Sequence, residues 1–169
     1  MKQTIRKGVF ETNSSSIHTL TILNNNESID YDKMLEDFDK RKYNIEVGEF
    51  GWEFEVYNDP ISILEYIYSF AFQRDNETDS QQNYVSKLKS LLPNTNFIEP
   101  EDDYYYYFID HCYDWENQLD FIFENKENLA ELMFNGEIRT GNDNTDRDYI
   151  EEKLYHPRDN IKIHLYKGN

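Results

Sequence analysis

The sequence predicts one α+β domain in which helices flank an antiparallel or mixed sheet. Segments whose side chains alternate from face to face, as in strands, occur between segments with helical spacing of apolar residues. The chain has 169 residues, enough for one core without metals or disulfides. No internal repeat or linker divides it. We therefore expect residues 1–169 to form a single acidic domain.

The first part of the chain predicts a strand, a short helix, a hairpin and a central helix. Residues 17–23 alternate as a two-faced strand does, and the charged residues 31–42 have the spacing of a short surface helix. Residues 43–57 predict a hairpin, because two alternating stretches flank a glycine-containing turn. Asp59 followed by Pro60 combines an N-cap with a first-turn proline, and begins a nearly all-apolar helix that we expect in the core.

The second part of the chain predicts further helices and short strands. A helix is expected over 79–92, ending before Pro93, and a short strand over 95–98. Asn125 is a candidate cap for a helix through Phe134 that Gly136 closes. The remaining elements are a strand over 137–140, a turn over 141–144, a helix over 149–154 and a strand over 161–166.

The charge of the chain restricts its partners. Asp and Glu number 34 against 17 Lys and Arg, which gives a net charge of −17. Such a field repels nucleic-acid phosphates and anionic membranes, and it accelerates encounter with a basic protein surface. We therefore expect a basic protein partner and no direct binding of nucleic acid or membrane. The alternative is that the acidity serves solubility alone.

The cysteine content and the hydropathy pattern indicate the compartment. Cys112 is the single cysteine, so an intramolecular disulfide and a zinc site built on several cysteines are excluded. No stretch has the length of a signal peptide or of a membrane span. We therefore expect a cytoplasmic protein, and the sequence leaves its oligomeric state open.

The first candidate site is the segment from Glu99 to Glu116, which contains no Lys or Arg. Its carboxylates and rings could copy the charge and stacking faces of a nucleic-acid strand, since Arg side chains pair with acids and stack on rings. The alternative is an edge strand whose alternate tyrosines pack on the core. The expected partner-binding residues are Glu99, Glu101, Asp102, Asp103, Tyr105, Tyr107, Asp110, Asp114 and Glu116.

The second candidate site lies between Arg6 and His18, where a cation, an amide, hydroxyls and an imidazole occur close together. Arg6, Asn13, Ser16 and His18 could hold a phosphate-bearing ligand, and Ser16 would share a strand face with His18 as a nucleophile beside a base. In the alternative, the polar residues form a hydrogen-bonded turn and His18 is a surface strand residue.

The sequence favours no metal, cofactor or catalytic residue. Asp110, His111 and Asp114 could contact a metal ion, but their spacing matches no defined motif. The segment 141–144 resembles the start of a calcium loop and lacks its closing glutamate. We therefore expect a protein that is not an enzyme.

Three blocks carry a resemblance to a known group of proteins. They are R-x-G-x-F-E-T-N-S-S-S-x-H from Arg6 to His18, Gly48-Glu49-Phe50-Gly51-Trp52-Glu53, and Gly141-Asn142-Asp143-Asn144. The chain resembles small acidic proteins encoded by phages and mobile elements of Gram-positive bacteria. This resemblance implies a common origin and fold, and it carries over no catalytic residue.

The charge and tyrosine content are also similar to those of anti-CRISPR proteins that occupy the nucleic-acid groove of a nuclease. The leading hypothesis is therefore a phage-type inhibitor that binds a basic nucleic-acid groove of a bacterial defence nuclease. The alternatives are a nucleotide- or phosphate-binding protein or enzyme that uses the Arg6 to His18 block, and a structural protein of a virion.

Overall fold

Five helices and six strands make up the described part of the chain. The computed structural model describes residues 16–23, 28–51, 54–76, 83–100, 109, 116–142 and 161–167, and of residues 16, 17, 116, 117, 142 and 161–167 it describes the backbone alone. The elements are, in order, β1 (Ser16–Leu23), α1 (Tyr31–Asp39), β2 (Asn44–Glu46), β3 (Glu55–Tyr57), α2 (Pro60–Asn76), α3 (Tyr84–Leu91), β4 (Asn96–Ile98), α4 (Glu116–Glu124), α5 (Lys126–Asn135), β5 (Gly136–Asn142) and β6 (Ile161–Lys167).

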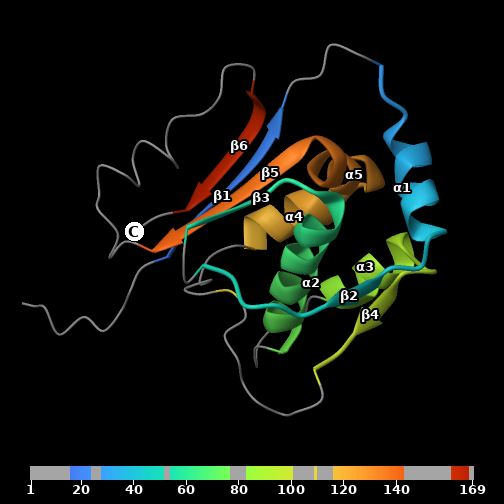
Figure 1. The fold of residues 1–169 in the computed structure, drawn as a ribbon, viewed down its shortest axis with the longest axis horizontal. Helices are drawn as coiled ribbons and strands as arrows, with labels where there is room; N and C mark the ends of the chain where they lie inside the picture. Colours follow the sequence, from blue (N-terminus) through green and yellow to red (C-terminus); the bar gives the residue numbers. More distant parts are fainter. Residues whose placement is uncertain are drawn as a thin grey trace, which may run out of the picture.

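The strands form two sheets. The larger sheet has the order β3-β5-β1-β6 and is antiparallel throughout, whereas β2 and β4 form a small parallel sheet. The helices α2, α4 and α5 lie to one side of the larger sheet, and α1, α3 and the small sheet lie beyond them (Figure 1). The architecture confirms the predicted α+β class with a mixed arrangement of strands and flanking helices.

Strand β1 is an inner strand of the larger sheet. It pairs with β5 on one side and β6 on the other. His18, Leu20 and Ile22 alternate with Thr19 and Thr21, and all five side chains are buried. The alternation therefore gives the strand two buried faces, and its polar face is not a solvent face.

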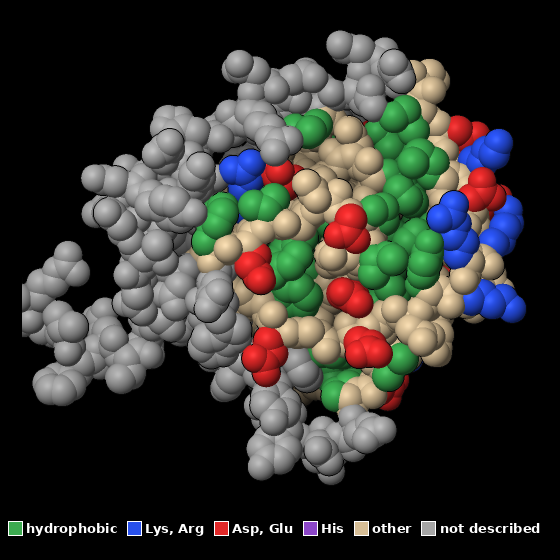
Figure 2. Space-filling view, viewed as in Figure 1, with side chains coloured by type: hydrophobic (Ala, Val, Ile, Leu, Met, Phe, Trp, Pro, Cys, Tyr) green, Lys and Arg blue, Asp and Glu red, His purple; other side chains and the backbone are tan. Residues whose placement is uncertain are grey.

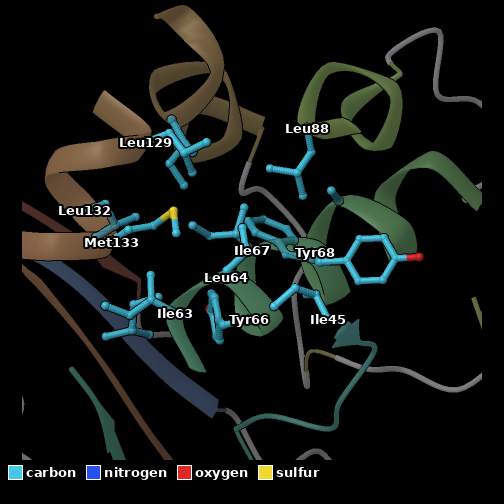
Figure 3. Packing of buried hydrophobic residues seen from close by; sticks show 14 of the residues in the cluster. Ile45, Ile63, Leu64, Tyr66, Ile67, Tyr68, Leu88, Leu129, Leu132 and Met133 are labelled. Atoms are coloured by element: carbon cyan, nitrogen blue, oxygen red, sulfur yellow. The ribbon is translucent and has the colours of Figure 1, made fainter. Parts of the chain in front are cut away.

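Helix α2 is at the centre of the core, as the sequence predicts. Asp59 caps it, because its Oδ1 accepts hydrogen bonds from the backbone N–H groups of Ile61 at 3.1 Å and Ser62 at 3.0 Å. Figure 3 shows apolar side chains from α2, α3, α5 and β2 converging around this helix. The labelled members are Ile45, Ile63, Leu64, Tyr66, Ile67, Tyr68, Leu88, Leu129, Leu132 and Met133, all buried.

Helix α3 begins at Tyr84, within the predicted range and later than its predicted start. Asn83 caps it by accepting from the backbone N–H of Ser86. The carboxylate of Asp75, at the end of α2, accepts from the N–H groups of Tyr84 at 2.9 Å and Val85 at 2.8 Å. A side chain of another helix thus satisfies two free N–H groups of this helix start, and residues 79–82 lie outside the described part.

Helix α5 passes directly into β5 at Gly136. Asn125 caps the helix, as predicted, by accepting from the backbone N–H of Asn128 at 2.8 Å. Gly136 closes it with φ −107°, where a Cβ would lie 2.3 Å from the carbonyl oxygen of Leu132. Glycine is needed here because of this close approach, and the backbone is not left-handed.

The end of β5 corrects the predicted turn. Gly141 and Asn142 belong to the strand and pair with Ile17 and Ser16. A turn starting at Gly141 is therefore wrong, and residues 143–144 lie outside the described part. The predicted strand over 161–166 is confirmed by β6, and the helix predicted over 149–154 also lies outside the described residues.

The hairpin predicted over residues 43–57 is wrong. Strand β2 pairs with β4, and β3 pairs with β5 in the other sheet. Between them, the N–H of Gly48 donates to Oγ of Ser69 at 2.9 Å, and Phe50 is buried and forms a parallel bridge with Ile109. The segment is held by contacts to α2 and to a distant residue, which replace the local pairing of a hairpin.

The small sheet is fixed to α1 by Asp39. This buried carboxylate accepts from the backbone N–H groups of Asn94 at 3.0 Å and Thr95 at 2.9 Å, and from the Thr95 hydroxyl at 2.9 Å. Its second oxygen accepts from the Asn94 amide at 2.7 Å. These bonds hold the turn that precedes β4 against the end of α1 and so place β4 beside β2.

Candidate partner-binding surface

The predicted acidic segment lies largely outside the described residues. The side chain of Glu99 is described: it is exposed and pairs with Lys89, with Nζ 2.9 Å from Oε1. Glu116 is the first residue of α4, and its backbone alone is described. The other expected residues lie outside the described part; they are Glu101, Asp102, Asp103, Tyr105, Tyr107, Asp110 and Asp114.

One residue of this segment, Ile109, is anchored in the core. Ile109 is buried, and its backbone N–H donates to Oε1 of Gln73 at 2.8 Å. The Gln73 amide donates back to the carbonyl oxygen of Ile109 at 3.4 Å. Gln73 is itself buried in α2, so its amide serves the backbone of Ile109 as a neighbouring strand would. The acidic segment is therefore attached to the central helix at this residue.

Glu99 also influences a tyrosine of the core. Burial, followed by the charge of Glu99, raises the pKa of Tyr68 to about 12. The Tyr68 ring packs against Phe72 and Phe97, with centroid distances of 6.1 Å and 5.0 Å. The phenol therefore stays protonated at neutral pH and serves as a core side chain beneath the start of the acidic segment.

The described residues contain a second acidic region, formed by Glu46 of β2 with Asp59 and Glu65 at the start of α2. Partial burial, together with the charges of Asp59 and Glu46, raises the pKa of Glu65. Acidic side chains lie across the middle of the face shown in Figure 2, where Figure 1 draws α2 and β2. We call Glu46, Asp59 and Glu65 the acidic cluster.

Three lysines of the described part, Lys40, Lys89 and Lys126, differ from this cluster in being paired with acids. Lys40 pairs with Glu36 and Asp37 on α1, and Lys126 reaches Asp32 and Glu36 at 3.3 Å and 3.9 Å. Most Lys and Arg side chains in Figure 2 lie at the edge where α1 is drawn. Among the ion pairs of the described residues, none includes a member of the acidic cluster.

The alternative ligand site has one described side chain, His18. Its Nδ1 lies 2.9 Å from the Tyr66 hydroxyl, and both side chains are buried. The interpretation of His18 as a surface strand residue is therefore wrong, because β1 is an inner strand that faces α2. Ser16 contributes described backbone only, and Arg6 and Asn13 lie outside the described part.

Two residues that sequence reasoning missed determine these positions. Gln73 anchors Ile109, and the Tyr66 hydroxyl forms a hydrogen bond with His18. The Tyr66 ring also packs edge-on against Phe50, with a centroid distance of 5.2 Å. The sequence does contain one signal: Gln73 is a long polar side chain in an otherwise apolar helix, and a buried amide needs hydrogen-bond partners. Its partner could not be read from the sequence.

Neither a metal site nor a membrane span is found in the described ranges. Within them, no three His, Cys, Asp or Glu side chains are grouped so as to hold a metal ion. The helices of this part of the chain are too short or too polar to cross a membrane.

Comparison with known proteins adds no assignment. The chain matches no protein-family model, no curated protein and no solved structure. The functional argument therefore depends on the chemistry of the surface.

Proposed function

We propose that this protein is a non-enzymatic, phage-type inhibitor that acts in the cytoplasm of a bacterial host. It binds the basic nucleic-acid groove of a defence nuclease and competes with the nucleic acid. The observation that supports this proposal is the acidic cluster: the charges of Asp59 and Glu46 disfavour the ionised form of Glu65, and no member of the cluster has an ion-pair partner in the described part of the chain. The net charge of −17 gives the whole chain the same preference.

A basic partner would stabilise the ionised form of Glu65. Partial burial and then the charges of Asp59 and Glu46 raise the pKa of this carboxyl, and a Lys or Arg of the partner offsets the repulsion between the charges. Attraction between exposed charges steers encounter and weakens as salt rises. The segment from Glu99 to Glu116, attached to α2 at Ile109, supplies further carboxylates and tyrosines for the same partner.

The alternative function, a phosphate-ligand site at Arg6, Asn13, Ser16 and His18, gains less support. The described member of that set, His18, is buried and bonded to Tyr66 rather than open to solvent. A protein–protein inhibitor needs no such pocket. We therefore prefer the acidic surface.

The proposal is tested by capture from a bacterial lysate with charge-matched variants. The test variant is Glu46→Gln with Glu65→Gln, and the control is Glu36→Gln with Asp37→Asn on α1. Each pair removes two negative charges, so the net charge is equal. If each lost contact contributes about 0.5–1 kcal/mol, the test variant binds its partner about tenfold more weakly and the control binds nearly as well as the original chain.

The captured protein must bind nucleic acid, elute at high salt, and lose nucleic-acid binding or cleavage when this protein is added. A binding assay and a cleavage assay on that protein separate the two modes of inhibition. Capture that is unchanged from low to high salt contradicts the proposal. Recovery of a nucleotide with no macromolecule would favour the ligand site in its place.

A further inference from the structure

Strand β3 is an edge strand of the larger sheet. It pairs with β5 through Glu55 with Thr140, Val56 with Arg139 and Tyr57 with Ile138. In the described part of the chain, no strand pairs with β3 on its other side. Because alternate residues of an antiparallel pair direct their backbone groups away from the partner strand, β3 presents N–H and C=O groups at this edge that no strand of the described residues pairs.

The side chains of β3 make this edge accessible. Val56 is 40% exposed and is one of two exposed large hydrophobic residues in the described part, together with Met34 on α1. Glu55 is exposed as well, and its carboxylate accepts a hydrogen bond from the Tyr57 hydroxyl. Tyr57 faces the core, where its ring lies edge-on to Phe50 with a centroid distance of 5.2 Å. Val56, the next residue along the strand, therefore points to the opposite face of the sheet.

The charge around the edge determines which strand can be added. Glu55 is in β3 itself, and Asp59 follows two residues after its end. A second copy of this chain would bring the same carboxylates, Glu55 and Asp59, to this edge a second time, between two proteins that each carry −17. An extended segment with Lys or Arg at alternate positions meets opposite charge on the Glu55 side and apolar contact on the Val56 side.

We propose that β3 is a docking edge for an extended, basic segment of the partner, which adds to the sheet as a fifth strand beside β3. Backbone hydrogen bonds fix the segment, and the alternation of basic and apolar side chains selects it. The inference rests on the proposed function, since it specifies how a basic partner is held. It adds a geometric requirement that charge attraction alone does not have.

The test uses an eight-residue peptide with blocked ends, in which lysine and valine alternate. A counterpart N-methylated at every residue keeps the charge and cannot donate backbone hydrogen bonds, and a glutamate-valine peptide reverses the charge. Binding is measured by NMR titration of the labelled protein, with hydrogen exchange of those β3 amides that point away from β5 as a second readout. We expect the lysine peptide to bind and to slow this exchange, and the other two peptides to bind at least tenfold more weakly.

Matched variants locate the site. Val56→Lys adds a cation at the edge and should weaken binding of the lysine peptide at least tenfold. Met34→Lys adds the same charge on α1 and should change that binding less than twofold. Thermal unfolding of both variants checks that the fold is kept. The exchange measurement on the original chain needs no substitution, so it decides the question even if a variant fails to fold.

Two results overturn the inference while leaving the proposed function standing. One is equal binding of the lysine peptide and its N-methylated counterpart, which indicates charge attraction without strand addition. The other is absence of peptide binding at low salt while the lysate still yields a nucleic-acid-binding protein. Failure of the proposed function is distinct, because it shows as loss of that capture or of its salt dependence.

Discussion

Replacing Gln73 with leucine should release the acidic segment from the core. Leucine has a similar size and keeps the apolar packing of α2, but it cannot accept from the Ile109 N–H, which lies 2.8 Å from Oε1. A buried donor left without a partner costs about 1–3 kcal/mol. The second bond, at 3.4 Å, is at the limit of hydrogen-bond geometry, and we assign it little energy.

This cost appears in amide exchange at Ile109 itself. Since 1.4 kcal/mol corresponds to a factor of ten, the protection of that amide should fall by about 5-fold to about 140-fold. The free energy of global unfolding, measured with urea, should fall by about the same 1–3 kcal/mol. Asn76→Ala is the matched control, because Asn76 also lies on α2 and its amide donates to the Phe72 carbonyl oxygen at an exposed position.

The same variant connects the fold to the candidate surface. Gln73→Leu leaves the net charge unchanged, so weaker partner binding would show that the anchoring of Ile109 positions the acidic segment. If the Ile109 amide exchanges as slowly in Gln73→Leu as in Asn76→Ala, Gln73 does not hold this segment and the reasoning is refuted.

Two further predictions concern carboxylates with structural roles. Asp39→Ala should lower the free energy of unfolding by about 2–4 kcal/mol, because it leaves donors of the turn before β4 without an acceptor. The control is Asp37→Ala, a change at an exposed neighbour that should lower it by less than about 0.5 kcal/mol. Equal losses of the two variants in urea unfolding would contradict the role of Asp39. At Asp59, burial alone would raise the pKa, but hydrogen bonds from Ser62 and Ile61 outweigh it and lower the pKa. The Asp59 contribution to stability is therefore present above its unfolded pKa of about 4 and is lost as pH falls through the lower folded value. Asp59→Ala should cost about 1 kcal/mol at pH 7 and progressively less in unfolding experiments below pH 4, and a cost independent of pH would count against the cap.

Local signals in the sequence predicted several elements correctly. Asp59 with Pro60 and Asn125 marked two helix starts, and alternation marked β1 and β6. Helix α4 was missed, although Leu119 and Ile122 have helical spacing and are both buried. No element was predicted over residues 117–124, because attention went to the acidic and aromatic residues that precede them.

The candidate surface was predicted in chemistry and only partly in position. The excess of carboxylates is a property of composition, so the sequence shows it directly. The acidic cluster was not predicted, because Glu46 and Glu65 are brought together by the packing of β2 on α2. The edge position of β3 was also hidden, since a hairpin with β2 would have paired that edge.

The sequence by itself determined the fold class, the starts of α1, α2 and α5, and the sign of the net charge. Caps and side-chain periodicity act over a few neighbouring residues, so a short stretch of sequence is enough to recognise them. The tertiary structure alone decided that β2 pairs with β4, that β3 pairs with β5, and that Gln73 meets Ile109. Strands of three residues contain too little pattern to specify a partner, and their pairing depends on contacts that the core of the whole domain brings together.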